Sequence, residues 1–93
     1  MKLKISYSKR MKRDLKLIKK RGLPLEEFED VVKKLQNQIP LEEKYKDHQL
    51  SGSLKQYREC HIRPDWLLIY RIYKSELVLA LSRTGTHADL LDM

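Results

Sequence analysis

Five residues in this sequence have side chains that suit acid–base chemistry on a charged substrate: three histidines, one aspartate and one arginine. Histidine titrates near neutral pH, so it can both accept and donate a proton in a reaction. Arginine binds phosphate oxygens through its planar guanidinium group. Together these residue types predict a site that transfers protons at a phosphate, if the fold brings them together. The residues are His48, His61, Asp65, Arg83 and His87.

The stretch Arg83-Thr84-Gly85-Thr86-His87 is the part of the chain on which this prediction depends most. It follows an apolar run at residues 77–81 that is typical of a buried strand. Its glycine permits a turn, and Thr86 with Asp89 three residues later resembles a capping box that starts a short final helix. His87 would then lie in the first turn of that helix, at the edge of a sheet. The alternative is a plain strand-to-helix turn with an exposed histidine.

Two expected turns bring the other residues toward the same end of the sheet. His61 ends one strand and Asp65 begins the next, so a short hairpin keeps them close. Arg83 lies near the start of this second strand if a turn at 74–75 pairs the second and third strands. A surface ion pair between Arg83 and Asp65 is the simpler alternative. His48 joins the group if its loop folds back over this end.

The position of Arg83 depends on the strand that precedes it. Arg83 has the parity of Leu77, Leu79 and Leu81, so it would face the core in a regular strand. The sequence therefore predicts that the strand ends or bulges before Arg83.

RNA cleavage without a metal is the chemistry that this set of residues fits best. The ribose 2′-hydroxyl is a nucleophile that RNA has and DNA lacks. A general base must remove its proton, a general acid must protonate the departing 5′-oxygen, and a cation must stabilise the charge on the phosphate. Zinc is the alternative, but the candidate ligands have no compact zinc-motif spacing, so we expect no metal and no cofactor. Those candidates are His48, His61, Asp65 and His87.

Hydrophobic periodicity predicts an α+β fold with the order β-α-α-β-β-β and a short final helix. Two amino-terminal helices are expected to pack as an antiparallel pair on a small, twisted, mostly antiparallel sheet. The segment 40–53 has no periodicity and is expected to be a long loop, a kind that is often functional. Trp66 and Tyr70 are expected in the core, because their strand is apolar on both faces. The expected strands cover 3–7, 57–62, 66–73 and 76–82, and the expected helices cover 9–21 and 24–35.

The net charge of +7 comes entirely from residues 9–21. Eight cations and the single acid Asp14 lie there, whereas cations and acids balance over the rest of the chain. A surface of one sign favours a polyanionic partner, so we expect a nucleic acid, ahead of an acidic protein or a membrane surface. The expected RNA contacts are Lys9, Arg10, Lys12, Arg13, Lys16, Lys19 and Lys20.

Length and composition limit the class of protein. The 93 residues predict a single domain over 1–93. The lone Cys60 excludes an internal disulfide and a cysteine-built metal site, and its place in an expected strand favours the core. No apolar run reaches the length of a signal peptide or a membrane span. We therefore expect a soluble, cytoplasmic protein without a membrane partner.

Three segments together resemble the YafQ branch of the RelE/ParE toxin superfamily. They are Tyr-Lys-Asp-His-Gln-Leu-Ser-Gly-Ser at 45–53, Tyr-Arg-Glu-Cys-His-Ile-Arg-Pro-Asp-Trp-Leu-Leu-Ile-Tyr at 57–70, and Arg-Thr-Gly-Thr-His-Ala-Asp-Leu at 83–90. The resemblance is close over 45–91 and is one of architecture over the helical half. It implies a RelE-like fold and a ribosome-dependent endoribonuclease that cuts mRNA in the A site and inhibits translation. It also implies a cognate antitoxin protein, which we expect to be acidic.

The same resemblance implies a role for each candidate. It makes His48, His61, Asp65 and His87 catalytic, with Arg83 contacting the phosphate. In that branch the equivalents of His87 and Asp65 are usually discussed as general acid and general base. His48 and His61 would then bind or neutralise the phosphate, and the choice of base between Asp65 and a histidine is open.

Two other classes remain as alternatives. One is a non-enzymatic, ParE-like toxin, which is not expected to keep His48, His61, Asp65 and His87 together. The other is an RNA-binding module without catalysis. No DNA binding is expected from the chain alone. A phenylalanine common near the carboxy terminus of the branch is Leu91 here, which leaves base stacking at that position open.

Overall fold

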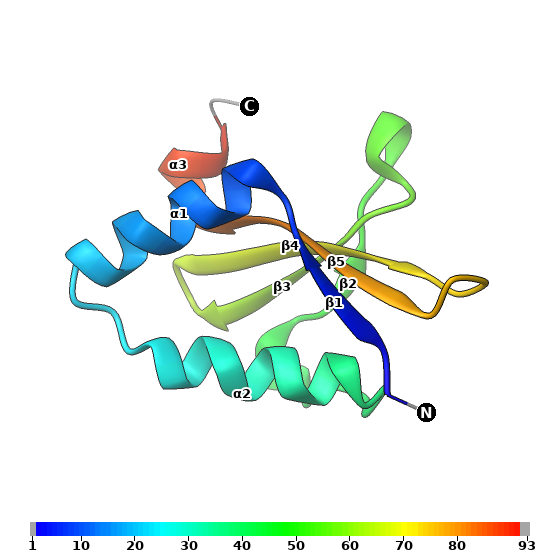
Figure 1. Ribbon diagram of the computed structural model, residues 1–93. Coiled ribbons are helices and arrows are strands. Elements are labelled where there is room, and N and C mark those ends of the chain that lie inside the picture. The colour runs from blue at the N-terminus through cyan, green and yellow to red at the C-terminus, as the bar shows by residue number, and fades with distance from the viewer. Residues whose placement is uncertain (1, 92–93) are drawn as a thin grey trace.

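A five-stranded, mostly antiparallel sheet forms the centre of the molecule (Figure 1). The computed structural model describes residues 2–91, apart from the side chain of Leu91. The strand order is β1-β5-β4-β3-β2, with β1 and β5 parallel and every other pair antiparallel. The predicted α+β class is confirmed, with one strand more than expected. The strands are β1 (Lys4–Tyr7), β2 (His48–Gln49), β3 (Arg58–Arg63), β4 (Trp66–Tyr73) and β5 (Val78–Gly85).

The additional strand, β2, lies inside the segment expected to be a long loop. The segment also contains two short 3-10 turns, η1 (Glu43–Tyr45) and η2 (Gly52–Leu54). β2 has only two residues, too few for an alternating pattern, so periodicity could not reveal it.

Helices α1 (Lys9–Lys20) and α2 (Leu25–Gln36) run in opposite directions along one face of the sheet (Figure 1). Ser8 caps α1 by accepting a hydrogen bond from the Met11 N–H at 2.9 Å, as expected. Gly22 ends the helix with φ +77°, a left-handed conformation that favours glycine. The apolar stripes of both helices point into the core, so their pairing on the sheet was predicted correctly.

The main core lies between these helices and the sheet. Met11 and Ile18 of α1 are fully buried there, together with Trp66, Tyr70 and Cys60. Burial raises the pKa of the Cys60 thiol to about 12, so the thiol is inert. The prediction that all three of these strand residues belong to the core is confirmed.

A smaller apolar cluster lies on the opposite face of the sheet. Leu67 and Ile69 of β4 pack there against Leu90 of α3 (His87–Leu91), with Leu50 and Tyr57 beside them. β4 is therefore covered on both faces, as its sequence predicted. Within residues 2–91, no helix has the length and apolarity needed to cross a bilayer.

Candidate functional site

His87 and Asp65 form the shortest contact among the predicted site residues. Asp65 lies in the turn between β3 and β4, and its Oδ1 accepts the His87 backbone N–H at 2.9 Å. The same oxygen lies 2.6 Å from Nδ1 of the His87 ring. An ionised carboxylate only accepts, so Nδ1 carries a proton and Nε2 is left for acid–base chemistry. Both hydrogen bonds from His87 lower the pKa of Asp65, and the one from the backbone N–H has the larger effect.

Glu59 connects the other two histidines. The Nε2 atoms of His48 and His61 lie 3.7 and 3.8 Å from the same oxygen, Oε1 of Glu59. Glu59 pairs with His48 across β2 and β3, and it shares a face of β3 with His61. The His61 and His87 rings meet edge to face, with their centroids 5.7 Å apart. The structure therefore brings the three histidines and Asp65 into one cluster, as the sequence predicted.

Two anchors in the long loop hold His48 in this cluster. The first is Lys46, which ends η1 in the left-handed conformation with φ 48°, and whose carbonyl lies 2.7 Å from His48 Nδ1. A carbonyl can only accept, so it fixes the proton on Nδ1 and leaves Nε2 facing the cluster. The second is Asp47, which accepts hydrogen bonds from the buried Tyr70 hydroxyl at 2.6 Å and from Arg58 Nε at 3.3 Å.

The turn before α3 forms the predicted capping box. The Thr86 N–H donates to Asp89 Oδ2 at 2.9 Å, and the Asp89 N–H donates to Thr86 Oγ1 at 3.1 Å. Gly85 leaves room for this carboxylate, because a Cβ at that position would lie 2.8 Å from Asp89 Oδ2. The final helix therefore begins at His87, and the turn directs this residue toward Asp65.

Arg83 is oriented by a β-bulge. Tyr70 pairs with Leu81 but Ile69 pairs with Arg83, so Ser82 is the extra residue on β5. The bulge moves Arg83 from the face of Leu81 to the face of Ile69, which confirms the predicted irregularity. The strand itself continues to Gly85, so the expectation that it ends near Ser82 was wrong.

The partner of Arg83 is Asp14 of α1 rather than Asp65. Arg83 Nε and Nη2 donate to the Asp14 carboxylate at 2.7 and 3.3 Å, and the Thr84 N–H donates to it at 3.1 Å. The Arg83 side chain is only 11% exposed, and among residues 2–91 its Nη1 has no hydrogen-bond partner. The structure therefore does not place Arg83 in the groove lined by His61 and His87; Arg83 pairs with Ile69 and lines a separate hollow with Ser82.

A groove of about 710 Å³ opens beside the histidine cluster. His61 and His87 form part of its wall, and Lys44 and Lys46 line another part of it. Such a volume suits a small ligand or one unit of a polymer. The half-buried Tyr45 adds an aromatic surface to the same wall.

The cations of α1 form a separate feature, here called the α1 basic face. All seven are exposed, and within residues 2–91 none of them forms an ion pair. The two other charged groups of the segment are paired, Asp14 with Arg83 and Arg21 with Asp89. The surface is therefore positive without internal compensation, as a polyanion-binding face requires. Its members are Lys9, Arg10, Lys12, Arg13, Lys16, Lys19 and Lys20.

This arrangement supplies the parts needed for proton transfer at a phosphate. One imidazole is oriented by a carboxylate, and two more share a second carboxylate. Glu59 is the member that the sequence reasoning missed, although its parity with His61 on a strand was the signal that could have found it. Among residues 2–91, no group of three or more His, Cys, Asp or Glu side chains is arranged to hold a metal ion.

Sequence comparison shows that the chain is similar to bacterial toxins. The family described as the bacterial toxin of type II toxin–antitoxin systems, YafQ, matches residues 3–92. The mRNA interferase toxin YafQ of Escherichia coli K12 is 42% identical over 87 residues, which cover 92% of each chain.

Structural comparison gives the same neighbours. A metal-bound toxin from Helicobacter pylori superposes with a TM-score of 0.90 at 48% identity, covering 95% of this chain and 98% of the other. YafQ in the E. coli DinJ–YafQ toxin–antitoxin complex superposes with a TM-score of 0.86 at 41% identity, covering 97% and 98%.

Proposed function

This chain belongs to the YafQ family of toxins of bacterial type II toxin–antitoxin systems and is an mRNA interferase, an endoribonuclease; we propose that it cleaves mRNA in the ribosomal A site by attack of the ribose 2′-hydroxyl on the adjacent phosphate. The observation that carries the mechanism is the His87–Asp65 contact of 2.6 Å, which leaves His87 Nε2 as an oriented proton donor. The reaction yields a 2′,3′-cyclic phosphate and a free 5′-hydroxyl, and consequently stops translation of the cut message.

His87 is the general acid in this proposal. Asp65 accepts the Nδ1–H, which orients the ring, and the imidazolium form of His87 carries the second proton on Nε2. That proton passes to the departing 5′-oxygen. A carboxylate that holds an imidazole in one tautomer and orientation is the arrangement that orients histidine in hydrolytic triads.

His61 is the general base that we favour over Asp65. Asp65 already accepts two hydrogen bonds from His87, and its lowered pKa makes it a weak base near neutrality. His61 stands 5.7 Å from the His87 ring and has Glu59 within 3.8 Å to stabilise the imidazolium formed when the 2′-hydroxyl loses its proton. His48, whose Nδ1–H is fixed by the Lys46 carbonyl, then binds the phosphate.

Arg83 contributes a further contact to the phosphate. Its Nη1 is buried and, among residues 2–91, has no hydrogen-bond partner, so the side chain must shift for this nitrogen to reach the phosphate. A well-placed donor at a developing charge contributes about 3–4 kcal/mol. The nucleotide next to the cleaved bond lies in the groove between Lys44, Lys46 and the two histidines, where the lysines neutralise its phosphate.

Two macromolecular partners follow from the surface and the family. The α1 basic face binds ribosomal RNA phosphates, since it carries all of the net charge of the chain. The second partner is a cognate antitoxin, as in the E. coli complex, and an acidic protein would suit the same cations.

The metal bound by the H. pylori relative calls for a direct test in this chain. The proposed steps use only side chains of the chain itself, so cleavage should continue after dialysis against EDTA with Mg²⁺ supplied only to the ribosome. Loss of cleavage that returns on adding Cu²⁺ or Zn²⁺ would show that a metal takes part.

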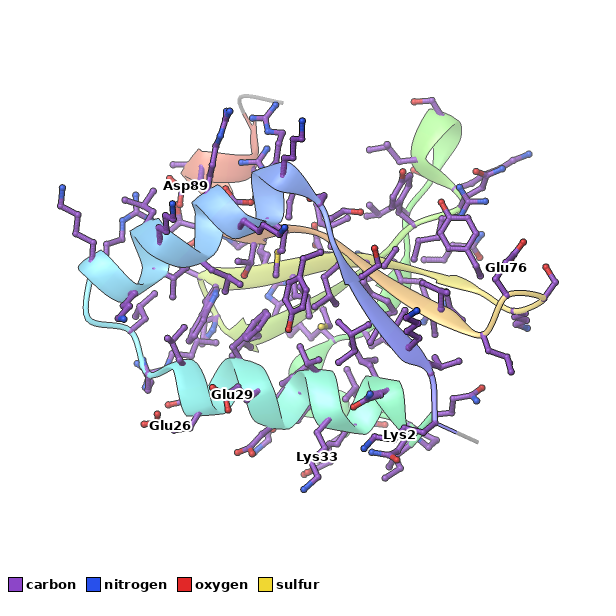
Figure 2. All side chains as sticks on the ribbon, in the orientation of Figure 1. Lys2, Glu26, Glu29, Lys33, Glu76 and Asp89 are labelled. Atoms are coloured by element: carbon purple, nitrogen blue, oxygen red, sulfur yellow. The ribbon has the colours of Figure 1, made fainter. Side chains whose placement is uncertain are left out.

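The decisive variant for the proposed function is His87→Ala. Removing the general acid should lower the rate of mRNA cleavage on purified ribosomes by about 10²–10⁴-fold. The fold should remain, because the His87 side chain is exposed and its ion pair with Asp65 lies at the surface, where such pairs add little stability. The control is Glu76→Ala, at the tip of the β4–β5 hairpin far from the site (Figure 2), which should cleave at the wild-type rate. Cleavage by a folded His87→Ala protein at the wild-type rate would overturn the assignment.

A further inference from the structure

The Asp89 carboxylate is shared between the capping box of α3 and the far end of α1. Its Oδ2 accepts the Thr86 N–H at 2.9 Å and Arg21 Nη1 at 2.6 Å, and its Oδ1 accepts Arg21 Nη2 at 3.1 Å. Two parallel bonds from a guanidinium fork are a strong, directional form of ion pair. Arg21 lies 68 residues before Asp89 and ends α1, where its own N–H bonds to the Leu17 carbonyl. Figure 2 shows Asp89 where α3 meets α1.

The helix that contains His87 is too short to be stable without contacts to the rest of the fold. α3 has five residues, far fewer than an isolated helix needs to be stable in water. Three contacts fix it: Leu90 in the smaller apolar cluster, Asp65 on His87, and Asp89 on the turn before it. The Asp89 carboxylate also packs closely against Gly85, where a Cβ would lie only 2.8 Å from its Oδ2.

We propose that Arg21 and Asp89 form a clamp that positions His87 for the proposed cleavage reaction, and that Arg21 therefore serves the active site although it belongs to the basic segment. His87 lies between Thr86 and Asp89 in one helical turn, so a shift of that turn moves its ring directly. Arg21 is fixed to the end of α1, so the clamp ties the turn to the helix that bears the basic face. This proposal rests on the proposed function, but its geometry can be tested separately.

The charge state of the pair supports the clamp. The hydrogen bonds from Arg21 and Thr86 lower the pKa of Asp89 well below its usual range, and the Asp89 carboxylate raises the pKa of Arg21. Both groups are therefore charged near neutral pH. Among residues 2–91, Arg21 is the one cation of the basic segment that forms an ion pair.

The test compares Asp89→Asn, Asp89→Ala and Arg21→Ala on ribosomes programmed with mRNA. Each should lower kcat at saturating ribosomes by about tenfold or more, since small misplacement of a catalytic group is costly. The double variant Arg21→Ala with Asp89→Ala should lower kcat no more than Asp89→Ala alone, because both changes break the same ion pair. Arg21→Lys should recover part of the rate. The matched control is Glu42→Ala, which breaks the exposed pair between Lys34 of α2 and Glu42 before η1 and should leave kcat unchanged.

Two readouts separate positioning from general stability and from ribosome binding. The Asp89 variants remove negative charge, so they should not weaken ribosome affinity, and their defect should lie in kcat. The ¹⁵N signals of the His87 ring should shift in Asp89→Asn, which keeps an oxygen for the Thr86 cap and should fold. Unchanged kcat and unchanged ring signals in the Asp89 variants would overturn the clamp. If the wild type cleaves no mRNA, the proposed function fails while the ring signals still decide the clamp.

Discussion

At the scale of single residues, two carboxylates contact different histidines of the cluster. Asp65 bonds to His87 through both its backbone and its ring, and Glu59 lies between His48 and His61. In the proposed mechanism each carboxylate acts by orienting imidazole rings. The mechanism we propose gives the proton transfers to histidines, because an imidazole ordinarily titrates near neutral pH.

The Asp65→Asn variant tests that assignment through the pH dependence of cleavage. The folded pKa of Asp65 is lowered, so its ionised contact with His87 is present above its usual value of 3.8 and disappears only as the pH falls through the folded pKa. A rise of kcat between about pH 5 and pH 8 must then come from a histidine base. We expect Asp65→Asn to cleave at least about 10²-fold more slowly and to keep this rise. A variant whose rate no longer rises over this range would contradict the assignment of a histidine as the base.

At the scale of elements, the features of the site encoded by neighbouring residues could be predicted from the sequence, whereas the contacts between distant residues could not. Thr86 and Asp89 lie three residues apart, so their capping box was visible in the sequence. The parity of Arg83 predicted that the strand ends or bulges before it, and the structure has the bulge. The Arg83–Asp14 and Arg21–Asp89 pairs join residues 69 and 68 positions apart, and no periodicity encodes such a pairing. The same holds for β2, which exists because β3 offers it a partner.

The long loop provides the prediction at this scale. Asp47 holds the loop to the sheet by accepting the Tyr70 hydroxyl, and Tyr70 is only 1% exposed. Replacing Asp47 by alanine leaves that buried hydroxyl without its partner, which should lower the free energy of unfolding by about 1–3 kcal/mol. The loop should also release His48, so cleavage should fall more than the loss of folded protein explains. Urea denaturation and the cleavage rate per folded molecule measure the two effects.

A paired change provides the control for the loop anchor. In the double variant Asp47→Ala with Tyr70→Phe, the unpaired hydroxyl is removed together with its acceptor. Stability should therefore recover relative to Asp47→Ala, whereas cleavage should stay low because His48 is still released. Recovery of both would mean that the loop affects cleavage only through stability.

At the scale of the whole molecule, the positively charged surface and the histidine cluster lie in different places. The α1 basic face lies on one helix, whereas the histidine cluster lies at the end of the sheet beside α3, and the Arg21–Asp89 and Asp14–Arg83 pairs connect the two regions. This layout suits the proposed function, in which one surface holds ribosomal RNA while another reaches the message. Under that proposal the basic face determines the affinity for the ribosome, and the histidine cluster determines the cleavage rate.

This separation predicts how a triple variant of the basic face should behave. Replacing Lys12, Arg13 and Lys16 by alanine should weaken ribosome binding and reduce the slope of log affinity against log salt by up to about 2–3 units, since each phosphate contact that is removed contributes about 0.7–0.9. The value of kcat at saturating ribosomes should change little. Binding measured at several salt concentrations, with cleavage measured at saturation, tests both statements.

The matched control removes the same charge from elsewhere on the molecule. Lys2, Lys33 and Lys74 are exposed and lie outside α1, with Lys33 on α2 and Lys2 near the carboxy-terminal end of α2 (Figure 2). Replacing these three by alanine leaves the same net charge as the first triple variant, so a purely global attraction would weaken both proteins equally. A local RNA contact instead requires that only the α1 variant loses the salt slope. Equal slopes in the two variants would show that the α1 basic face is not the ribosome-binding surface.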